Sequence, residues 1–337
     1  MARPMPARAG SRGLLDHCRP NWYFPFQMGG IKMKIRALQL ISQGRLSWEE
    51  IELPAPEGGQ VLIKTEYSAV DAGSQLPIFT GQVPGDYPRF MGWEVLGRVT
   101  RCGPDVKRIK PGDQVLAFYG HREEGLTDQD QVIVVPEGVS HRIALLSGIS
   151  SQVVGGIRKV NPRPRKPVLI SGAGMRGLFT LFVLKASGKE YVDVIEPVDE
   201  RRELARGLGA RFAVTPEESV DVGGLYPVAF ECSNSNESFQ RIQSRMLPGG
   251  SISVIADTVP EELVLSREFY RRDLQLFSTS FDPDSHVYAR WFFDNVEGYE
   301  QLLETMFTEE VSTDELPGLF DRIKNESRRP LRILVKY

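Results

Sequence analysis

The residues best suited to chemistry form a glycine-rich turn in the middle of the chain. The segment Gly172-Ala173-Gly174-Met175-Arg176-Gly177 follows the apolar run Val168–Ser171 and precedes a stretch with helical spacing of apolar residues. In such a turn the first glycine permits a tight bend, the second lets the backbone approach a phosphate, and the third lets the helix pack closely on the strand. Backbone N–H groups at the start of the helix then bind phosphate oxygens. The turn therefore predicts a site for the pyrophosphate of a dinucleotide.

An acidic residue, Glu196, ends the next predicted strand. A carboxylate at that place accepts hydrogen bonds from the hydroxyls of the adenosine ribose and repels a 2′-phosphate, which favours NAD over NADP. Arg176, Arg201 and Arg202 compete with this interpretation, because any of them could pair with a phosphate. Arg176 lies inside the turn, so we expect it to neutralise the pyrophosphate. The alternative is a glycine turn without a ligand.

The elements around this turn alternate between strand and helix from about residue 160 to 280. This order predicts a parallel sheet with helices on both faces. The predicted elements are strands over Val168–Ser171, Tyr191–Ile195, Phe212–Val214, Val228–Glu231, Ser251–Ile255 and Gln275–Thr279, with helices after Gly177 and over Arg201–Leu208.

The flanking parts of the chain have a different pattern. From Met33 to about Ser150, short alternating strands and frequent turns predict a small antiparallel barrel. After the sheet we expect helices over Trp291–Phe307 and Leu316–Ile323 and a strand over Leu331–Tyr337. The aromatic cluster at the start of the first helix favours a core or dimer surface over a substrate site.

Composition excludes several classes of function. The 337 residues are 41% hydrophobic and 25% charged, with a net charge of −3, so nothing favours binding to nucleic acid. No apolar run reaches the ~20 residues that a membrane span needs. The three widely spaced cysteines, Cys18, Cys102 and Cys232, exclude a CxxC zinc site and fit a reducing compartment, so we expect a cytoplasmic protein. Residues 1–32 are Arg-rich, as in an organellar targeting sequence, but we favour a disordered extension.

Several further segments match one known family. Gly92–Val99 resembles its GHE segment, Val106–Val115 its "xxFKPGDxV" turn, and Glu203–Ala210 its "ELAKELGA" helix end. Phe230–Ser233 and Leu247–Gly250 resemble the strand and turn near the nicotinamide. Together with the glycine turn, these motifs make the chain similar to the medium-chain dehydrogenase/reductases from Met33 to Tyr337.

The resemblance implies an α/β protein with a GroES-like β-rich catalytic domain and a Rossmann domain with a doubly wound parallel sheet. The implied boundaries are 33–157 with 283–337 for the catalytic domain and 158–282 for the dinucleotide-binding domain. Cys232 and Ser233 would then contact the cofactor. Members of the family often pair their dinucleotide domains, so the resemblance also implies a homodimer.

The chain departs from the family at the zinc ligands. By segment matching, the positions of the Cys, the His of GHE and a later Cys or Glu hold Asp71, Trp93 and Ser147. Trp offers no lone pair to a metal and Ser is a poor zinc ligand. We therefore expect no zinc. Ser68–Gln75 is similar to the "SGISTGTE" stretch of the bacteriochlorophyllide hydroxyethyl dehydrogenase branch, which also has an aromatic residue in place of the His.

Alcohol oxidation without a metal needs a side chain that accepts the hydroxyl proton. Asp71 is the first candidate for this base, with Ser74 and Tyr119 as relays. Each has a plainer role open to it, since Asp71 could cap the following turn and Ser74 could cap a helix. Glu94 is a second candidate, although the acid of that segment is usually buried structural support in the family.

Three more residues are candidates for the substrate pocket. Trp93 would form a wall that stacks against a flat or apolar substrate. His121 follows a glycine in a loop that often lines the cleft of the family, although a lone loop histidine is more often simply solvated. Ser147 completes the set through its match to a ligand position.

The sequence leaves four functions open. The first is a zinc-independent, NAD-dependent dehydrogenase that acts on a secondary alcohol or its ketone, in a specialised biosynthetic pathway. The second is an NADPH-dependent quinone or enone reductase. The third is an enzyme that oxidises its substrate transiently during elimination or epimerisation, and the fourth is a dinucleotide-binding protein without catalysis. In each case the partner is a small molecule.

Overall fold

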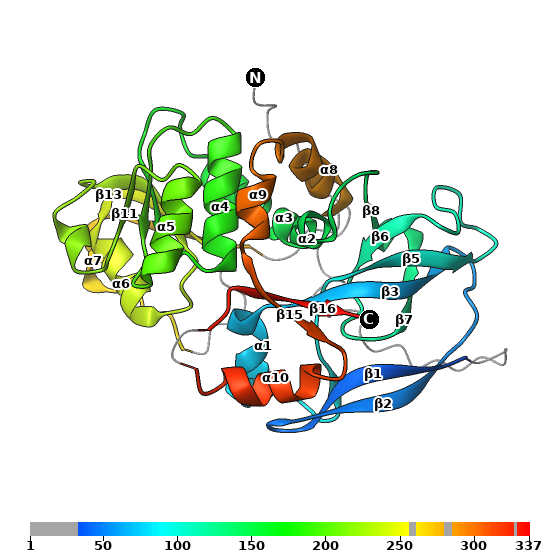
Figure 1. Ribbon diagram of the computed structural model, residues 1–337. Coiled ribbons are helices and arrows are strands. Elements are labelled where there is room, and N and C mark those ends of the chain that lie inside the picture. Colours follow the sequence, from blue (N-terminus) through cyan, green and yellow to red (C-terminus); the bar gives the residue numbers. More distant parts are fainter. Residues whose placement is uncertain (1–32, 256–260, 280–284, 327–328) are drawn as a thin grey trace. The chain divides into compact units, whose positions relative to one another are not determined.

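The computed structural model describes residues 33–255, 261–279, 285–326 and 329–337, which form two compact units. We call residues 149–308 the parallel-sheet unit, and residues 33–148 with 309–337 the antiparallel unit (Figure 1). The predicted extension 1–32, with Cys18, lies outside the described residues.

The unit boundaries differ from the predicted 157/158 and 282/283. The segment 149–157 belongs to the parallel-sheet unit because helix α3 (Ser150–Val160) packs against α4 (Met175–Ala186) and the sheet. Helix α8 (Ser285–Asn295) packs against α3 and draws the segment up to residue 308 into the same unit.

Six parallel strands form the sheet of the first unit, in the order β11-β10-β9-β12-β13-β14. This order is that of a doubly wound Rossmann sheet, as expected. The strands are β9 (Val168–Ser171), β10 (Val192–Ile195), β11 (Phe212–Val214), β12 (Tyr226–Glu231), β13 (Met246–Val254) and β14 (Gln275–Ser278). The strand order reverses between β9 and β12, and the crevice at the carboxyl ends of two such strands is where ligands bind.

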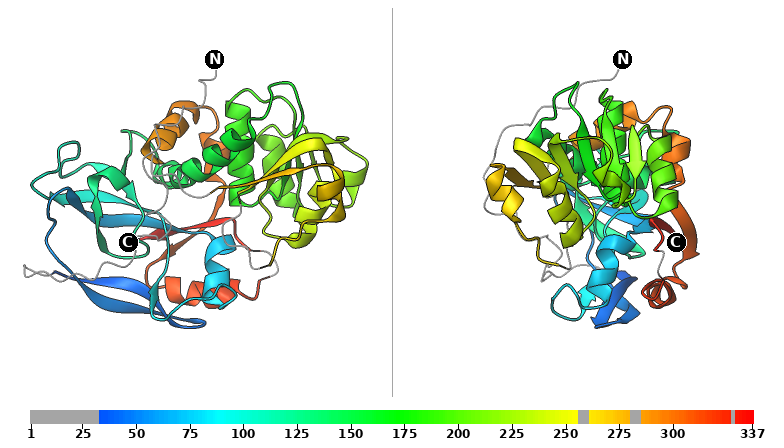
Figure 2. Two further views of the ribbon diagram at one scale, coloured as in Figure 1. Left: turned by 180° about the vertical axis from the view of Figure 1, so that it is seen from behind. Right: turned by 90° about the vertical axis from the view of Figure 1, so that its left-hand side faces the viewer.

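Helices cover both faces of this sheet. Helices α3, α4 and α5 (Asp199–Gly207) pack on one face, and α6 (Asn236–Ser244) and α7 (Arg267–Arg271) lie on the other (Figure 2). The core between α6 and the sheet includes Leu169, Phe239, Ile242 and Ile252. Behind α4, the fully buried Phe292 of α8 packs its ring against Phe179 and Phe182, which confirms the core assignment of the aromatic cluster.

The second unit is built from antiparallel strands, as the alternating pattern predicts. One sheet has the order β15-β16-β3-β5-β6-β8, with β7 also paired to β3, and a smaller sheet has the order β2-β1-β4. The strands are β1 (Met33–Ser42), β2 (Arg45–Leu53), β3 (Gln60–Val70), β4 (Arg89–Phe90), β5 (Val95–Cys102), β6 (Gln114–Ala117), β7 (Glu124–Asp128), β8 (Ile133–Val134), β15 (Phe307–Ser312) and β16 (Arg332–Lys336). In β3 the side chains of Val61, Ile63 and Thr65 are buried, which places one face of this strand in the core.

Three helices lie in the antiparallel unit: α1 (Ala72–Phe79), α2 (His141–Leu146) and α10 (Leu316–Ile323). Helices α1 and α10 share a core in which the rings of Phe79 and Phe320 lie 5.4 Å apart. Short 3-10 turns, η1 (Gln129–Gln131), η2 (Ser147–Ile149) and η3 (Glu218–Val220), complete the described elements of the chain.

The predicted helix over Trp291–Phe307 is wrong. The segment forms α8 and the short α9 (Glu300–Glu304), separated by Gly298 with a φ of +83°, and Phe307 already begins β15. A left-handed glycine ends a helix because its backbone conformation breaks the i→i−4 ladder. Over the residues that the structure describes, no helix is long and apolar enough to cross a bilayer.

Candidate functional site

The glycine-rich turn lies between β9 and α4, at the carboxyl edge of the parallel sheet. Gly172 has a φ of +89°, and a Cβ there would lie 2.8 Å from the Cα of Ser233. A Cβ on Gly177 would lie 1.8 Å from the carbonyl oxygen of Gly172. These two positions need glycine for the turn and for the close packing of α4 on the strand, as expected.

Gly174 differs from both of these glycines. It precedes the first residue of α4, Met175, and a Cβ built on it meets no heavy atom within 4 Å. Among the residues that the structure describes, no packing contact therefore requires glycine at this position. The backbone here borders open space at the N-terminus of a twelve-residue helix, where a phosphate is favoured by the N–H groups and the helix dipole.

Glu196 follows β10 and reaches back to the turn. The residue is 3% exposed, and its Oε2 accepts a hydrogen bond of 2.6 Å from the N–H of Ala173. Oε1 accepts a hydrogen bond of 2.9 Å from the N–H of Val198. The carboxylate thus joins the glycine turn to the β10–α5 loop, a structural role that the sequence did not predict.

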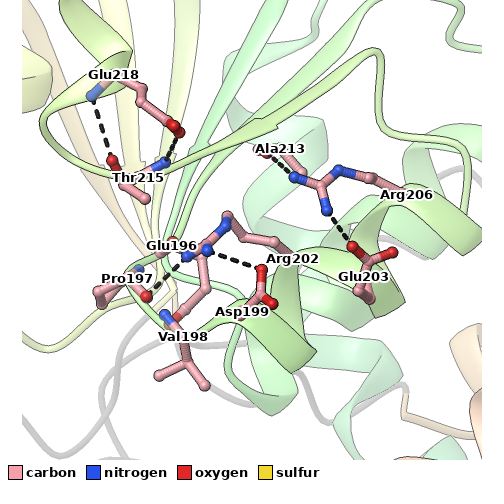
Figure 3. Close-up of polar contacts among 10 residues, drawn as sticks. All are labelled: Glu196, Pro197, Val198, Asp199, Arg202, Glu203, Arg206, Ala213, Thr215 and Glu218. Carbon is pink, nitrogen blue, oxygen red and sulfur yellow. Dashed lines mark hydrogen bonds and ion pairs between the residues drawn. The ribbon is translucent and has the colours of Figure 1, made fainter.

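The three arginines considered as phosphate ligands have different surroundings. Arg176 donates from Nε to Oε1 of Gln152 at 3.0 Å, on the neighbouring helix α3. Arg202 donates to backbone carbonyls of the Glu196 loop (Figure 3). Arg201 is partly exposed on α5. Arg176 therefore joins the start of α4 to α3, whereas Arg202 is held by backbone carbonyls of the Glu196 loop.

The end of β12 lies beside the turn, and the backbone N–H of Cys232 donates to the carbonyl of Ser171 at 2.9 Å. Glu231 is fully buried, and its Oε1 accepts hydrogen bonds from the backbone N–H of Ser233 at 2.6 Å and from the hydroxyl of the same residue. Burial raises the pKa of Glu231 to about 7, opposed by the hydrogen bonds from Ser233. Burial also raises the pKa of Cys232, so its thiol stays protonated.

The motif Phe230–Ser233 contains Glu231, but the sequence does not indicate the contacts of its carboxylate. The sequence signal that could have indicated these contacts is a carboxylate at the end of a buried parallel strand. The other quoted segment, Leu247–Gly250, lies at the amino end of β13 and not at the edge that carries the glycine turn. The prediction that this segment is a turn near the nicotinamide is wrong, because these residues form the N-terminal part of β13.

Asp71 is the N-cap of α1. Its Oδ1 accepts a hydrogen bond of 2.9 Å from the N–H of Gly73, and the side chain is buried. Ser74 is the third residue of the helix, and its hydroxyl lies 3.4 Å from the carbonyl oxygen of Asp71. The structure therefore shows Asp71 in the capping role that was the alternative to catalysis. The residue that caps the helix is Asp71 and not Ser74.

Tyr119 lies in the core between β3, β5 and β6. Its hydroxyl is 2.8 Å from Oγ1 of Thr65, and the residue is 5% exposed. Burial raises the pKa of this hydroxyl. The prediction of a proton relay is corrected to a structural contact, because the hydroxyl is enclosed in the core and bonded there.

Glu94 forms a buried ion pair with Arg332 of β16. Oε2 of Glu94 lies 3.3 Å from Nη2 of Arg332, and the two side chains are 5% and 0% exposed. Nη2 of Arg332 also donates to the carbonyl of Leu145 at 3.3 Å. Glu94 thus has the expected role of structural support. Arg332 was missed, because a single arginine in an apolar strand gives no sign of its partner.

His121 is fully buried and bonded through both ring nitrogens. Nδ1 lies 2.8 Å from the hydroxyl of Ser68 and Nε2 lies 3.2 Å from Oε1 of Gln75. Burial lowers the pKa of His121 to about 3, so the ring is neutral. This corrects both expectations, a pocket residue and a solvated loop histidine, since the ring is a polar part of the core.

The remaining pocket candidates are Trp93 and Ser147. Trp93 is half-buried just before β5. Ser147 is fully buried at the end of α2, where its hydroxyl donates to the carbonyl of Ala144 at 2.6 Å. Ser147 is therefore a helix-end contact of the core rather than a pocket surface.

The residues at the zinc-ligand positions do not fit a catalytic zinc. Asp71 caps a helix, Ser147 bonds a carbonyl, and the Trp93 indole has no lone pair to donate. Within the described ranges, no three His, Cys, Asp or Glu side chains are grouped so that they could hold a metal ion.

Comparison with known proteins gives the same architecture. Residues 57–160 match the family model of the alcohol dehydrogenase GroES-like domain. An L-threonine 3-dehydrogenase from Pyrococcus horikoshii is 28% identical over 248 residues, which cover 61% of this chain and 71% of the relative.

Two solved structures share the fold at low sequence identity. A zinc-binding dehydrogenase from Sinorhizobium meliloti 1021 bound to NADP has a TM-score of 0.78 at 19% identity, covering 90% of this chain and 100% of the other. An alcohol dehydrogenase from Escherichia coli CFT073 complexed with NADH has a TM-score of 0.77, also at 19% identity, covering 90% of this chain and 99% of the other.

Proposed function

We propose that this NAD(P)-dependent oxidoreductase is a member of the medium-chain dehydrogenase/reductase superfamily. We propose further that it oxidises a secondary alcohol, or reduces the ketone, with NAD(H) and without zinc. The observation that carries the proposal is the turn at Gly172, Gly174 and Gly177, in which two glycines are required by packing and the third faces open space. A pyrophosphate that approaches Gly174 is the physical reason for a glycine there.

Glu196 supports the choice of NAD. Its carboxylate is fixed at the end of β10, where a negative charge accepts hydrogen bonds from ribose hydroxyls and repels a 2′-phosphate. When bound, the nicotinamide supplies hydride transfer. The N–H groups at the start of α4 and the side chain of Arg176 would hold the pyrophosphate, with Arg201, Cys232 and Ser233 as the further proposed contacts.

Asp71 is the proposed base. Without zinc, a carboxylate that accepts the hydroxyl proton lowers the barrier to forming the alkoxide. Asp71 can combine this role with its cap, because the N–H of Gly73 fixes the carboxylate through Oδ1. Trp93 is the proposed wall of the substrate pocket, whereas Ser74, Tyr119, Glu94, His121 and Ser147 serve the fold in this account.

Turnover screens with secondary alcohols, including polyols and cyclitols, test the proposal when NAD and NADP are compared at equal concentration. We expect reduction of NAD, no change after chelator treatment, and weaker activity with NADP. Turnover only with NADPH and an enone or quinone would support the competing reductase instead. Bound cofactor that is never consumed would indicate transient oxidation, and binding without turnover would indicate a protein that has lost catalysis.

A homodimer and a cytoplasmic location remain predictions from the sequence. Native mass measurement tests the first. Fractionation of cells that express the full chain tests the second.

A further inference from the structure

The loop that follows β10 is held from one side by a single guanidinium. Arg202 lies in the first turn of α5, and its Nη1 donates to the carbonyl oxygens of Glu196 at 2.8 Å and Pro197 at 2.7 Å (Figure 3). Its Nη2 donates to Oδ1 of Asp199 at 2.9 Å. The Arg202 side chain is 11% exposed, whereas the side chain of its partner Asp199 is 68% exposed.

The position of Arg202 is electrostatically unusual. A cation in the first turn of a helix faces the positive end of the helix dipole, which disfavours it. The acidic residues of the same turn, Asp199 and Glu200, are the types that the dipole favours. Specific contacts must therefore compensate for the cation, and the carbonyls of Glu196 and Pro197 supply them.

The same loop is held from the other side by the Glu196 carboxylate. Oε1 accepts from the N–H of Val198 within the loop, and Oε2 accepts from the N–H of Ala173 in the glycine turn. The backbone of Glu196 is thus fixed by Arg202 while its side chain fixes the glycine turn. A movement of the loop would shift the carboxylate and the turn together.

We propose that Arg202 is a positioning and specificity-determining residue for the dinucleotide: it holds the Glu196 loop so that the carboxylate both supports the glycine turn and faces the adenosine ribose. The inference rests on the proposed preference for NAD. It also gives the reason why an arginine so near the loop does not select NADP, since its N–H groups are directed to carbonyls and to Asp199.

Arg206, one turn later on α5, provides a matched control. Its Nη2 donates to the carbonyl of Ala213 at 2.8 Å and its Nη1 to the carboxylate of Glu203, so it also joins a carbonyl to an acidic side chain. It does not contact the Glu196 loop, and its side chain is 45% exposed. Arg202→Met and Arg206→Met remove the same charge and leave similar aliphatic chains.

The experiment combines two measurements on the full chain. Backbone hydrogen exchange of the amides of Ala173 and Val198 reports the loop itself, and equilibrium titration with NADH and NADPH reports its effect on binding. For Arg202→Met we expect faster exchange at both amides and a loss in NADH affinity of about tenfold, as for one or two hydrogen bonds. NADPH affinity should change little, so discrimination between the two falls by about the same factor. Arg202→Lys, which keeps the charge but lacks the planar fork, should lie between Arg202→Met and the wild type.

The outcomes separate the two proposals. Unchanged exchange at Ala173 and Val198 in a folded Arg202→Met variant overturns the positioning role, whatever the cofactor preference. Faster exchange with unchanged NADH discrimination, or the same losses in Arg206→Met, overturns the specificity role. A selective loss of NADPH affinity in Arg202→Met would show that Arg202 binds the 2′-phosphate, which contradicts the inference. A wild type that prefers NADPH contradicts the proposed use of NAD. The exchange measurement still tests, independently of that result, whether Arg202 positions the loop.

Discussion

The glycine turn of the parallel-sheet unit and the Asp71–Glu94 region of the antiparallel unit were both expected to do chemistry, yet their polar groups are used differently. Around the turn, as far as the structure describes the chain, Gly174 borders open space and no side chain caps the N-terminus of α4. In the other region, Glu94 is paired and Asp71 caps a helix. The first arrangement leaves backbone groups available to a ligand, whereas the second employs side chains mainly in holding the fold.

Replacing Asp71 by Asn is the strongest test of that difference. Asparagine also caps helices well, so we expect the fold to survive with a change in stability within about 1 kcal/mol. Loss of the proton acceptor should lower kcat by about 10²–10⁴-fold if Asp71 is the base. Turnover by the folded variant at the wild-type rate would remove Asp71 from the mechanism and leave this region purely structural.

The Glu94–Arg332 pair tests the structural side of the comparison. Arg332→Met leaves the Glu94 carboxylate buried without its partner, and such a loss costs about 3–5 kcal/mol in the free energy of unfolding, measurable with urea. The double variant Glu94→Leu with Arg332→Met removes both charges and should regain much of this loss. A single variant as stable as the wild type would contradict a supporting role.

Replacement of two glycines of the same turn by alanine should affect different properties: stability for Gly177 and cofactor affinity for Gly174. Gly177→Ala places a methyl group 1.8 Å from the carbonyl oxygen of Gly172 and should cost about 1–3 kcal/mol in stability or more. The methyl group of Gly174→Ala meets no atom of the described part of the chain, so the melting temperature should remain while the affinity for NADH falls by about tenfold or more. Equal NADH affinity of Gly174→Ala and wild type would contradict the assignment of the phosphate site.

The two units also contain buried groups whose titration has opposite consequences. The pKa of His121 falls from 6.5 to about 3, so the unfolded chain binds the proton more readily and stability is lost as the pH drops from about 6.5 toward 3. The pKa of Glu231 rises from 4.5 to about 7, so the folded chain holds the proton and stability is lost as the pH rises from about 4.5 through 7.

Urea unfolding at a series of pH values, with His121→Gln and Glu231→Gln, separates these effects. Each group contributes a slope of at most about 1.4 kcal/mol per pH unit in its window. His121→Gln should flatten the fall in stability toward acid, and Glu231→Gln should flatten the fall toward neutral pH. Slopes unchanged in both variants would show that neither group is buried in the form described here.

The contrast between the units also explains what could be predicted from the sequence. The Rossmann strands β9 and β11 have the predicted bounds, because short apolar runs next to glycine turns are local signals. The requirement for glycine at positions 172 and 177 is equally local, since it depends on backbone conformation and on the next element of the chain.

The contacts of the antiparallel unit depend on residues far apart in the sequence. Nothing near Glu94 indicates Arg332, and nothing near His121 indicates that Ser68 and Gln75 enclose it. Side-chain networks of this kind form only when the strands have paired, so residue types and spacing predict candidates but not their partners. The same limit applies to Arg202, whose carbonyl acceptors carry no sequence signal.

The central claim is that the chain keeps the dinucleotide half of a dehydrogenase while its other half works without zinc. The most direct test is the metal content of purified, active protein, measured together with turnover before and after treatment with a chelator. We predict far less than one zinc per chain and unchanged turnover, because Asp71, Trp93 and Ser147 do not form a zinc site. About one zinc per chain, lost together with activity, would contradict the account.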